Sequence, residues 1–331
     1  MRTLLQQLSH RYPTLSVAVV ALALTAGYLQ SQTAKPALPN PYRAIENWAK
    51  LPAGRAWGSA AGISIDSREN LWVFERCAGN SCSGRGESPI LQFDPSGKLM
   101  KQFGEGMFVF PHGIFVDREN NVWVTDADGK DGKGHQVVKF SPDGKVLFSL
   151  GKAGVAGAGP DTFNRPSGVV VAPNGAVFVA DGHGGDSNAR IVKFSKDGKF
   201  IKAWGKKGTA PGEFNGPHSI TIDSKGRIFV ADRENNRIQI FDQDGKFLEQ
   251  WTQFGRPTGL FMDRHDVLYV TDNLAGIRIG SAKDGVVTAF IPDLEASSSN
   301  RTGAEGVVTD KNGNLYAAEV LRTMVKKYVP K

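Results

Sequence analysis

The sequence predicts an all-β protein, a β-propeller of six four-stranded blades, and two patterns support this. A phrase in which Gly or Ser precedes alternating apolar residues occurs six times. Each copy is followed by a polar turn and then by a second apolar run that ends on an acid. Four short strands in roughly 40–50 residues are typical of a propeller blade. The six copies are GISID (62–66), GIFVD (113–117), GVVVA (168–172), SITID (219–223), GLFMD (259–263) and GVVTD (306–310).

Each repeat supplies the strands of its blade in order. The phrase itself is the first strand, and the second strand is the apolar run that ends in an acid, as in LWVFE, VFVAD and LYAAE. The third often carries Phe and leads into a turn such as Asp-Gly-Lys, and the fourth often ends in an aromatic residue, as in KFIKAWG. Short runs rich in β-branched and aromatic residues, bounded by Gly, Asn and Asp, indicate antiparallel hairpins.

The last repeat lacks a fourth strand, because the chain ends at VKKYVPK after three. The missing strand is expected near the start of the propeller, since residues 44–66 parallel residues 199–223, with Trp48 matching Trp204. We therefore expect an N-terminal strand to complete the sixth blade, which leaves no free sheet edge. The propeller is predicted to span residues 44–331.

Residues 1–34 differ from the rest of the chain. Arg2 and Arg11 precede an apolar run at residues 15–29, and small residues follow. The run is short for a membrane span, which needs about 20 apolar residues, so we favour an export signal over a retained single-pass anchor. Residues 35–43 are expected to form a Pro-rich linker. The protein is then exported, periplasmic or extracellular, and contacts a membrane only if the signal is retained.

The composition excludes several classes of protein. The 331 residues include 39 Gly without a three-residue period, which indicates many turns rather than a fibrous protein. The net charge is +7, but the Lys residues lie singly in turns, so no nucleic-acid partner is expected. Two Cys exclude a disulfide-dense scaffold. After export Cys77 and Cys82 are expected to form a disulfide, with two free thiols as the alternative. We expect a monomer.

The residue before each repeated phrase occupies the equivalent position in its blade, so the six residues form a ring around the propeller axis. In repeat order these residues are Ala61, His112, Ser167, His218, Thr258 and Glu305. His112, His218 and Glu305 fall on alternate repeats, about 120° apart in a six-bladed ring. Two imidazoles and a carboxylate suit zinc with an open position for substrate, so a metal site is predicted. The alternative is a chance alternation without a ligand.

The second strands end on the same face. Acids occupy their last position in all six repeats, which indicates a structural role. The next residue is Arg in repeats one and four, and Arg76 and Arg233 suit a substrate carboxylate. Surface ion pairs with Glu75 or Glu234 are the alternative. His183, in the glycine-rich loop HGGDSN, is a candidate general base or additional ligand, or else a solvated loop residue.

Two segments carry a family resemblance. FPHGIFVD (110–117) and GPHSITIDSKGRIFVADRENNRIQIF (216–241) resemble NHL repeats of the peptidyl-α-hydroxyglycine α-amidating lyase family, and the resemblance covers roughly residues 44–329. It implies that three His hold zinc, two Arg engage substrate and a Tyr is the base. His112 and His218 match two ligands, and Arg76 and Arg233 match the two Arg. Glu305 replaces the third His, and His183 replaces the Tyr.

The resemblance implies a lyase that cleaves a small or peptide-derived α-hydroxyglycine to an amide and glyoxylate, with His183 removing the hydroxyl proton. The family also has a structural calcium, whose Asp is replaced here by Gly306. A non-catalytic propeller that binds a protein or small ligand on the same face is the second hypothesis. A calcium-dependent lactonase is the third, and the His-rich ring disfavours it.

Overall fold

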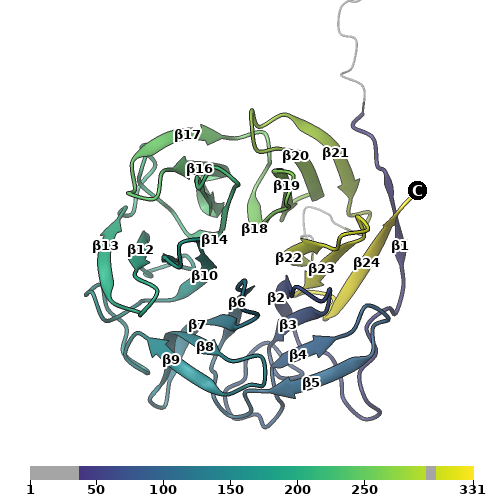
Figure 1. Cartoon of the computed structure of the whole chain (residues 1–331), viewed down its shortest axis with the longest axis horizontal. Helices are drawn as coiled ribbons and strands as arrows, with labels where there is room; N and C mark the ends of the chain where they lie inside the picture. Colours follow the sequence, from purple (N-terminus) through teal and green to yellow (C-terminus); the bar gives the residue numbers. More distant parts are fainter. Residues whose placement is uncertain (1–36, 296–302) are drawn as a thin grey trace, which may run out of the picture. The chain divides into compact units, whose positions relative to one another are not determined.

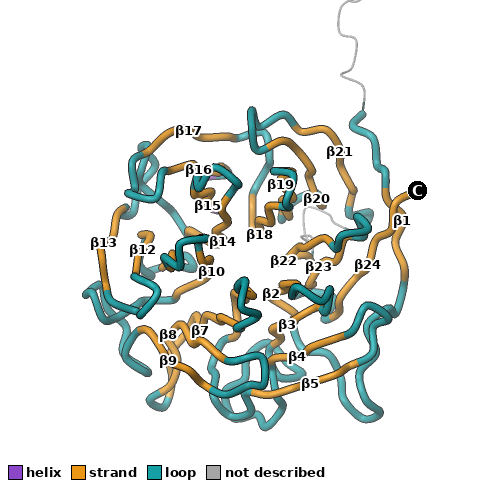
Figure 2. Tube along the Cα trace, in the orientation of Figure 1, coloured by secondary structure: helices purple, strands orange, loops and turns teal. Residues whose placement is uncertain are grey.

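The computed structural model describes residues 37–295 and 303–331. The segment predicted as an export signal, residues 1–34, lies outside the described residues. Residues 39–331 form one compact unit, in which strands are joined by turns and loops (Figures 1 and 2). Within the described part of the chain, no helix is long and apolar enough to cross a membrane.

The described strands form six antiparallel sheets of four, as predicted. Blade one contains β2 (Ala60–Ile65), β3 (Leu71–Glu75), β4 (Ile90–Phe93) and β5 (Leu99–Phe103). Blade two contains β6 (Pro111–Val116), β7 (Val122–Lys130), β8 (Lys133–Phe140) and β9 (Val146–Leu150). Blade three contains β10 (Pro166–Val171), β11 (Val177–Asp181), β12 (Arg190–Phe194) and β13 (Phe200–Trp204).

The remaining blades follow the same order. Blade four contains β14 (Pro217–Ile222), β15 (Ile228–Asp232), β16 (Arg237–Phe241) and β17 (Phe247–Trp251). Blade five contains β18 (Pro257–Met262), β19 (Val267–Asp272), β20 (Gly276–Ser281) and β21 (Val287–Pro292). Blade six contains β22 (Ala304–Thr309), β23 (Leu315–Glu319), β24 (Met324–Pro330) and β1 (Tyr42–Ile45). The six first strands surround the axis, and the fourth strands form the outer edge (Figure 1).

The ring is closed by β1, which pairs antiparallel with β24. This confirms closure by an N-terminal strand, but the strand begins at Tyr42, two residues inside the segment expected to be linker. The strand β1 ends at Ile45, whereas the match of Trp48 with Trp204, the last residue of β13, predicted a strand that reaches Trp48. Asn47 adopts a left-handed conformation (φ 53°) and turns the chain, so Trp48 leaves the strand. Its buried ring instead packs on Tyr316, with ring centroids 4.8 Å apart.

The hydrophobic core lies between neighbouring blades rather than within one blade. One cluster joins Phe178 of blade three to Ile220 and Phe241 of blade four, and each other junction has a similar cluster. The second strands are covered on both faces, which is why they are apolar at successive positions instead of alternating. Fourth strands such as β5 lie at the outer edge, and the three central residues of β5 are exposed.

Candidate metal centre

The acids that end the second strands fasten the loops on one face of the ring, as their presence in every repeat predicted. Asp232 is fully buried and accepts hydrogen bonds from the Asn215 backbone N–H (2.7 Å) and from Arg237 Nε (2.7 Å). Asp181 likewise accepts from the Asn164 N–H and pairs with Arg190. Each acid thus ties the loop that enters the first strand of its own blade. The residue after the acid is held at the mouth of the axis.

Asp126 is the exception among these acids. It accepts the backbone N–H groups of Val109 (2.9 Å) and Phe110 (2.6 Å). Gln136, however, lies opposite Asp126 in the register, where Arg237 lies opposite Asp232. Burial therefore raises the pKa of the Asp126 carboxyl to about 7, because no cation offsets the loss of hydration.

This raised pKa predicts a stability that falls with pH. The folded state binds a proton at Asp126 that the unfolded state, with a pKa of 3.8, has already released, so the free energy of unfolding decreases as pH rises towards about 7. In Asp126→Asn, the difference in unfolding free energy between about pH 5 and about pH 8 should shrink by on the order of 1–2 kcal/mol. Urea denaturation at both pH values measures it. The exposed Asp143→Asn is the control and should not alter the difference.

A β-bulge aims the ring-position residue of each blade at the axis. In the pairing of the first strand with the second, His112 and Gly113 have no partner in blade two, and His218 has none in blade four. A register shift occurs at the same place in the other four blades. A bulge re-orients a side chain in this way. The glycine that follows is required by the next blade, because a Cβ at Gly113 would lie 2.6 Å from the Ser167 carbonyl oxygen. The repeated glycine therefore reflects close packing around the axis.

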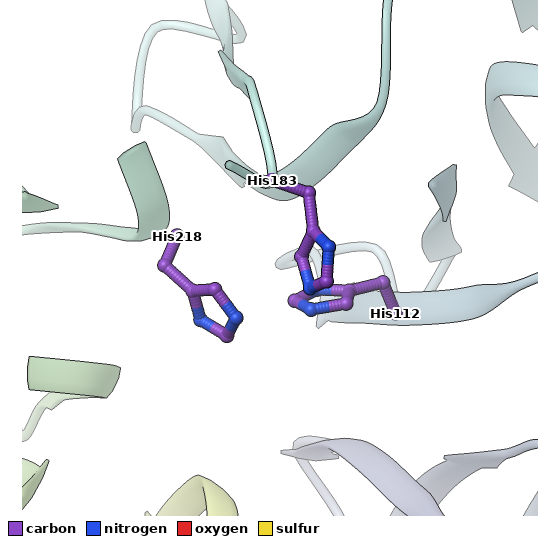
Figure 3. A group of neighbouring side chains, drawn as sticks. All are labelled: His112, His183 and His218. Carbon is purple, nitrogen blue, oxygen red and sulfur yellow. The ribbon is translucent and has the colours of Figure 1, made fainter. Parts of the chain in front are cut away.

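Three imidazoles converge at this end of the axis. His112 and His218 belong to β6 and β14, and His183 belongs to the loop after β11 (Figure 3). One ring nitrogen from each lies within 4.8 Å of the others. The Nδ1 atoms of His112 and His218 lie 2.6 Å and 2.8 Å from the carbonyl oxygens of Ser167 and Thr258. Since a carbonyl only accepts, both Nδ1 atoms carry hydrogen and both Nε2 atoms present a lone pair.

The chemistry of these nitrogens fits a metal ion. The Nε2 atoms of all three His are buried and have no hydrogen-bond partner in the part of the chain that the structure describes. Burial, with a contribution from Arg76, lowers the pKa of His112 to about 3. Burial also lowers the pKa values of His183 and His218 well below the usual range. The imidazoles are therefore neutral, which is the form that binds metals.

Glu305 lies beside this cluster rather than within it. Its Oε2 is 3.8 Å from His112 Nε2 and 3.8 Å from Arg76 Nη2, and it has no hydrogen-bond partner among residues 37–295 and 303–331. The sequence placed Glu305 in the metal triangle and left His183 open as a general base, an additional ligand or a solvated residue. The structure groups His183 with the two other imidazoles. The predicted metal triangle used only the position before each repeated phrase, whereas His183 lies in the loop after a second strand.

The two arginines have different surroundings. Arg76 is buried; its Nε donates to the Pro111 carbonyl (3.0 Å), and its guanidinium lies over the Phe110 ring (3.8 Å). Arg233 instead donates to Glu234 (3.0 Å) and to the His183 carbonyl (3.3 Å). Arg233 thus forms the ion pair with Glu234 that the sequence analysis gave as the alternative to binding a substrate carboxylate. Glu75 does not pair with Arg76, because its partner is Arg55.

Comparison with known proteins agrees with the strand geometry and with the repeat pattern. The family model described as NHL repeat matches residues 163–194 and 214–241, which contain the first three strands of blades three and four. The six-bladed propeller thus contains NHL repeats. The solved structure titled streptogramin B lyase is similar in fold, with a TM-score of 0.60 over 88% of this chain and 98% of that chain, at 17% identity. This likeness concerns the fold alone.

Two curated relatives are more similar to this chain in sequence than that solved structure is. Peptidyl-alpha-hydroxyglycine alpha-amidating lyase 1 of Drosophila melanogaster is 40% identical over 208 residues, which cover 54% of this chain and 36% of that protein. Peptidyl-glycine alpha-amidating monooxygenase of Mus musculus is 38% identical over 202 residues. The match spans 54% of this chain but about a fifth of the mouse protein (20%). The predicted resemblance to lyases of this name is therefore confirmed over about half of the chain.

Proposed function

We propose that the protein is a metal-dependent lyase that cleaves the C–N bond of an α-hydroxyglycine compound, releasing an amide and glyoxylate. The observation that carries the proposal is the convergence of three neutral imidazoles, His112, His183 and His218, with unpaired Nε2 atoms. Leaving three buried acceptors without partners is costly, and a metal ion removes that cost. The similarity to the Drosophila lyase supports the choice of reaction.

Zinc is the ion that this donor set fits best. Three His ligands that leave one position open are typical of catalytic zinc sites, and zinc lowers the pKa of an oxygen that it binds. Calcium requires six to eight oxygen ligands, roughly, and is a poor match. Glu305 is the single carboxylate among the residues that line the axial cavity, which has a volume of about 250 Å³.

The surrounding residues complete the proposed reaction. Arg76 and Arg233 hold the carboxylate of the substrate, since guanidinium groups match carboxylates in shape and charge. Glu305, whose Oε2 has no hydrogen-bond partner among the described residues, accepts the proton of the substrate hydroxyl. The hydroxyl oxygen then forms the C=O bond of glyoxylate while the C–N bond breaks. The departing nitrogen takes up the proton that Glu305 accepted and leaves as the amide, which restores the Glu305 carboxylate. Of the roles that the sequence left open for His183, this proposal takes that of additional ligand, and it moves Glu305 from ligand to base.

A pair of substitutions tests these two roles. His183→Ala should lose stoichiometric zinc, whereas Glu305→Gln should keep zinc and lose about a hundredfold or more in kcat, the usual effect of removing a general base. Metal analysis and an assay of glyoxylate release from N-benzoyl-α-hydroxyglycine measure the two effects. If Glu305→Gln loses the ion and His183→Ala retains it, the assignment made from the sequence is correct instead. A zinc-loaded wild-type protein that releases no glyoxylate would reject the reaction.

We also propose that the protein acts outside the cytoplasm. The structure joins Cys77 and Cys82 in a disulfide, and such bonds persist in oxidising compartments. The apolar run at residues 15–29 supports the same location. Counting free thiols in protein recovered from its native compartment tests the proposal, since two free thiols would contradict it.

A further inference from the structure

A small covalent ring follows Arg76 directly in the sequence. The disulfide closes the segment CAGNSC, and Cys77 and Ala78 both have left-handed backbone conformations (φ 52° and 54°). Two successive residues of this kind without a glycine are strained and persist only where neighbouring groups hold them. One such group is Glu75, whose Oε2 accepts the Ala78 N–H (2.9 Å). The sharp turn reverses the chain immediately after Arg76.

The reversed chain brings Asn80 back over Arg76. The Asn80 Oδ1 accepts a hydrogen bond from Arg76 Nη1 at 2.7 Å. Together with the Pro111 carbonyl on Nε and the Phe110 ring on one face, this contact fixes the plane of the guanidinium. The Nη2 group remains directed at the site, where it lies 3.8 Å from Glu305. Asn80 thus occupies one edge of the guanidinium and leaves another edge for a ligand.

Packing does not hold Asn80 in place, because the residue is exposed. The ring is instead attached to the next blade through two hydrogen bonds. Ser81 Oγ and the Cys82 N–H both donate to the Val109 carbonyl oxygen, each at 2.9 Å. An exposed side chain on an open loop would sample many positions, and closing the loop covalently removes most of them.

We propose that Asn80 is a positioning residue, which aims Arg76 at the substrate carboxylate, and that the Cys77–Cys82 ring holds Asn80 in place. The inference rests on the proposed function in one respect, namely that Arg76 binds a carboxylate. Asn80 itself need not touch the substrate. Its effect should therefore be on substrate binding rather than on the metal or on the chemical step.

Asn80→Ala in the zinc-loaded full chain tests the first half of the proposal. The KM for N-benzoyl-α-hydroxyglycine should rise about three- to tenfold, the worth of one hydrogen bond, while kcat and zinc content stay near the wild-type values. Asn312→Ala, at an exposed turn residue, is the matched control and should change none of these. A wild-type KM in Asn80→Ala, with a raised KM in Arg76→Ala, would overturn the positioning role.

The ring is tested by combining substitutions. The pair Cys77→Ser and Cys82→Ser should raise KM about as much as Asn80→Ala, and the three changes together should raise it no further, because the ring acts through Asn80. Independent, additive effects would show that the ring acts by another route. A thermal melt of each variant checks that the propeller remains folded.

A second readout keeps the inference separate from the proposed reaction. If the wild-type protein releases no glyoxylate, modification of Arg76 by phenylglyoxal, followed by peptide mass spectrometry, replaces the kinetic assay. The modification rate should rise several-fold in Asn80→Ala and in the Cys pair, because the guanidinium is then less constrained. Rates equal to the wild type would overturn the positioning role, whatever reaction the site performs.

Discussion

If the proposed function is correct, His112→Ala is expected to yield a folded propeller that neither binds zinc nor releases glyoxylate. The change removes one of three ligand nitrogens, together with the hydrogen bond from Nδ1 to the Ser167 carbonyl that orients it. A structural ligand set contributes about 10–16 kcal/mol in total, so losing one of three donors should weaken zinc affinity by about a thousandfold or more. Glyoxylate release should fall by at least about the same factor, since the ion supplies the hydroxyl activation.

Metal analysis after dialysis and the glyoxylate assay measure both losses. His265→Ala is the control, because His265 is exposed in a turn between the first and second strands of blade five and is not part of the cluster. It should retain zinc and full activity. A His112→Ala variant that binds zinc at one equivalent with undiminished affinity would remove the basis of the metal centre.

Arg237→Met is expected to cause the largest loss of stability among single changes on the site face. Arg237 donates to the fully buried Asp232 and also to the carbonyl oxygens of Thr209 (2.7 Å) and Glu213 (2.8 Å). Removing it leaves a buried carboxylate without a cation, which typically costs about 3–5 kcal/mol. Urea denaturation measures the loss. Adding Asp232→Asn should recover a large part of it, because the uncompensated charge is then absent.

An exposed ion pair provides the matched comparison. Lys152 and Asp161 lie 2.6 Å apart, closer than Arg237 and Asp232, but both side chains are 60% exposed. Lys152→Met should therefore cost about 1 kcal/mol or less. Equal losses in the two variants would mean that burial does not set the cost of breaking these pairs.

The repeat pattern predicted the ring because each copy occupies an equivalent environment. Alternating apolar residues, turn glycines and the strand-end acids recur where the same packing recurs, as at Asp181 and Asp232. The inward placement of His112 and His218 followed from the same equivalence, although the bulge that aims them was not evident from the sequence.

Features that break the repeat were harder to predict. His183 joins the cluster from a glycine-rich loop of blade three. The sequence indicated this residue as a candidate base or ligand, but the repeat pattern could not decide between these roles. Trp48 matched Trp204 in sequence, yet a left-handed Asn47 takes it out of the strand. The contact of Asn80 with Arg76 depends on two strained dihedral angles. Such local geometry is set by tertiary contacts, which a single sequence does not display.

The pairing of β1 with β24 has a consequence for how the protein is made. Ala44 lies opposite Tyr328, so the pairing joins parts of the chain that are almost the full propeller apart in sequence. Closing so long a loop costs chain entropy before any contact rewards it, and such pairings form slowly. During synthesis β1 emerges early and waits until β24 has left the ribosome. The seam of the ring is thus the last part to form, and a protein paused before that moment exposes two unpaired strand edges to its neighbours.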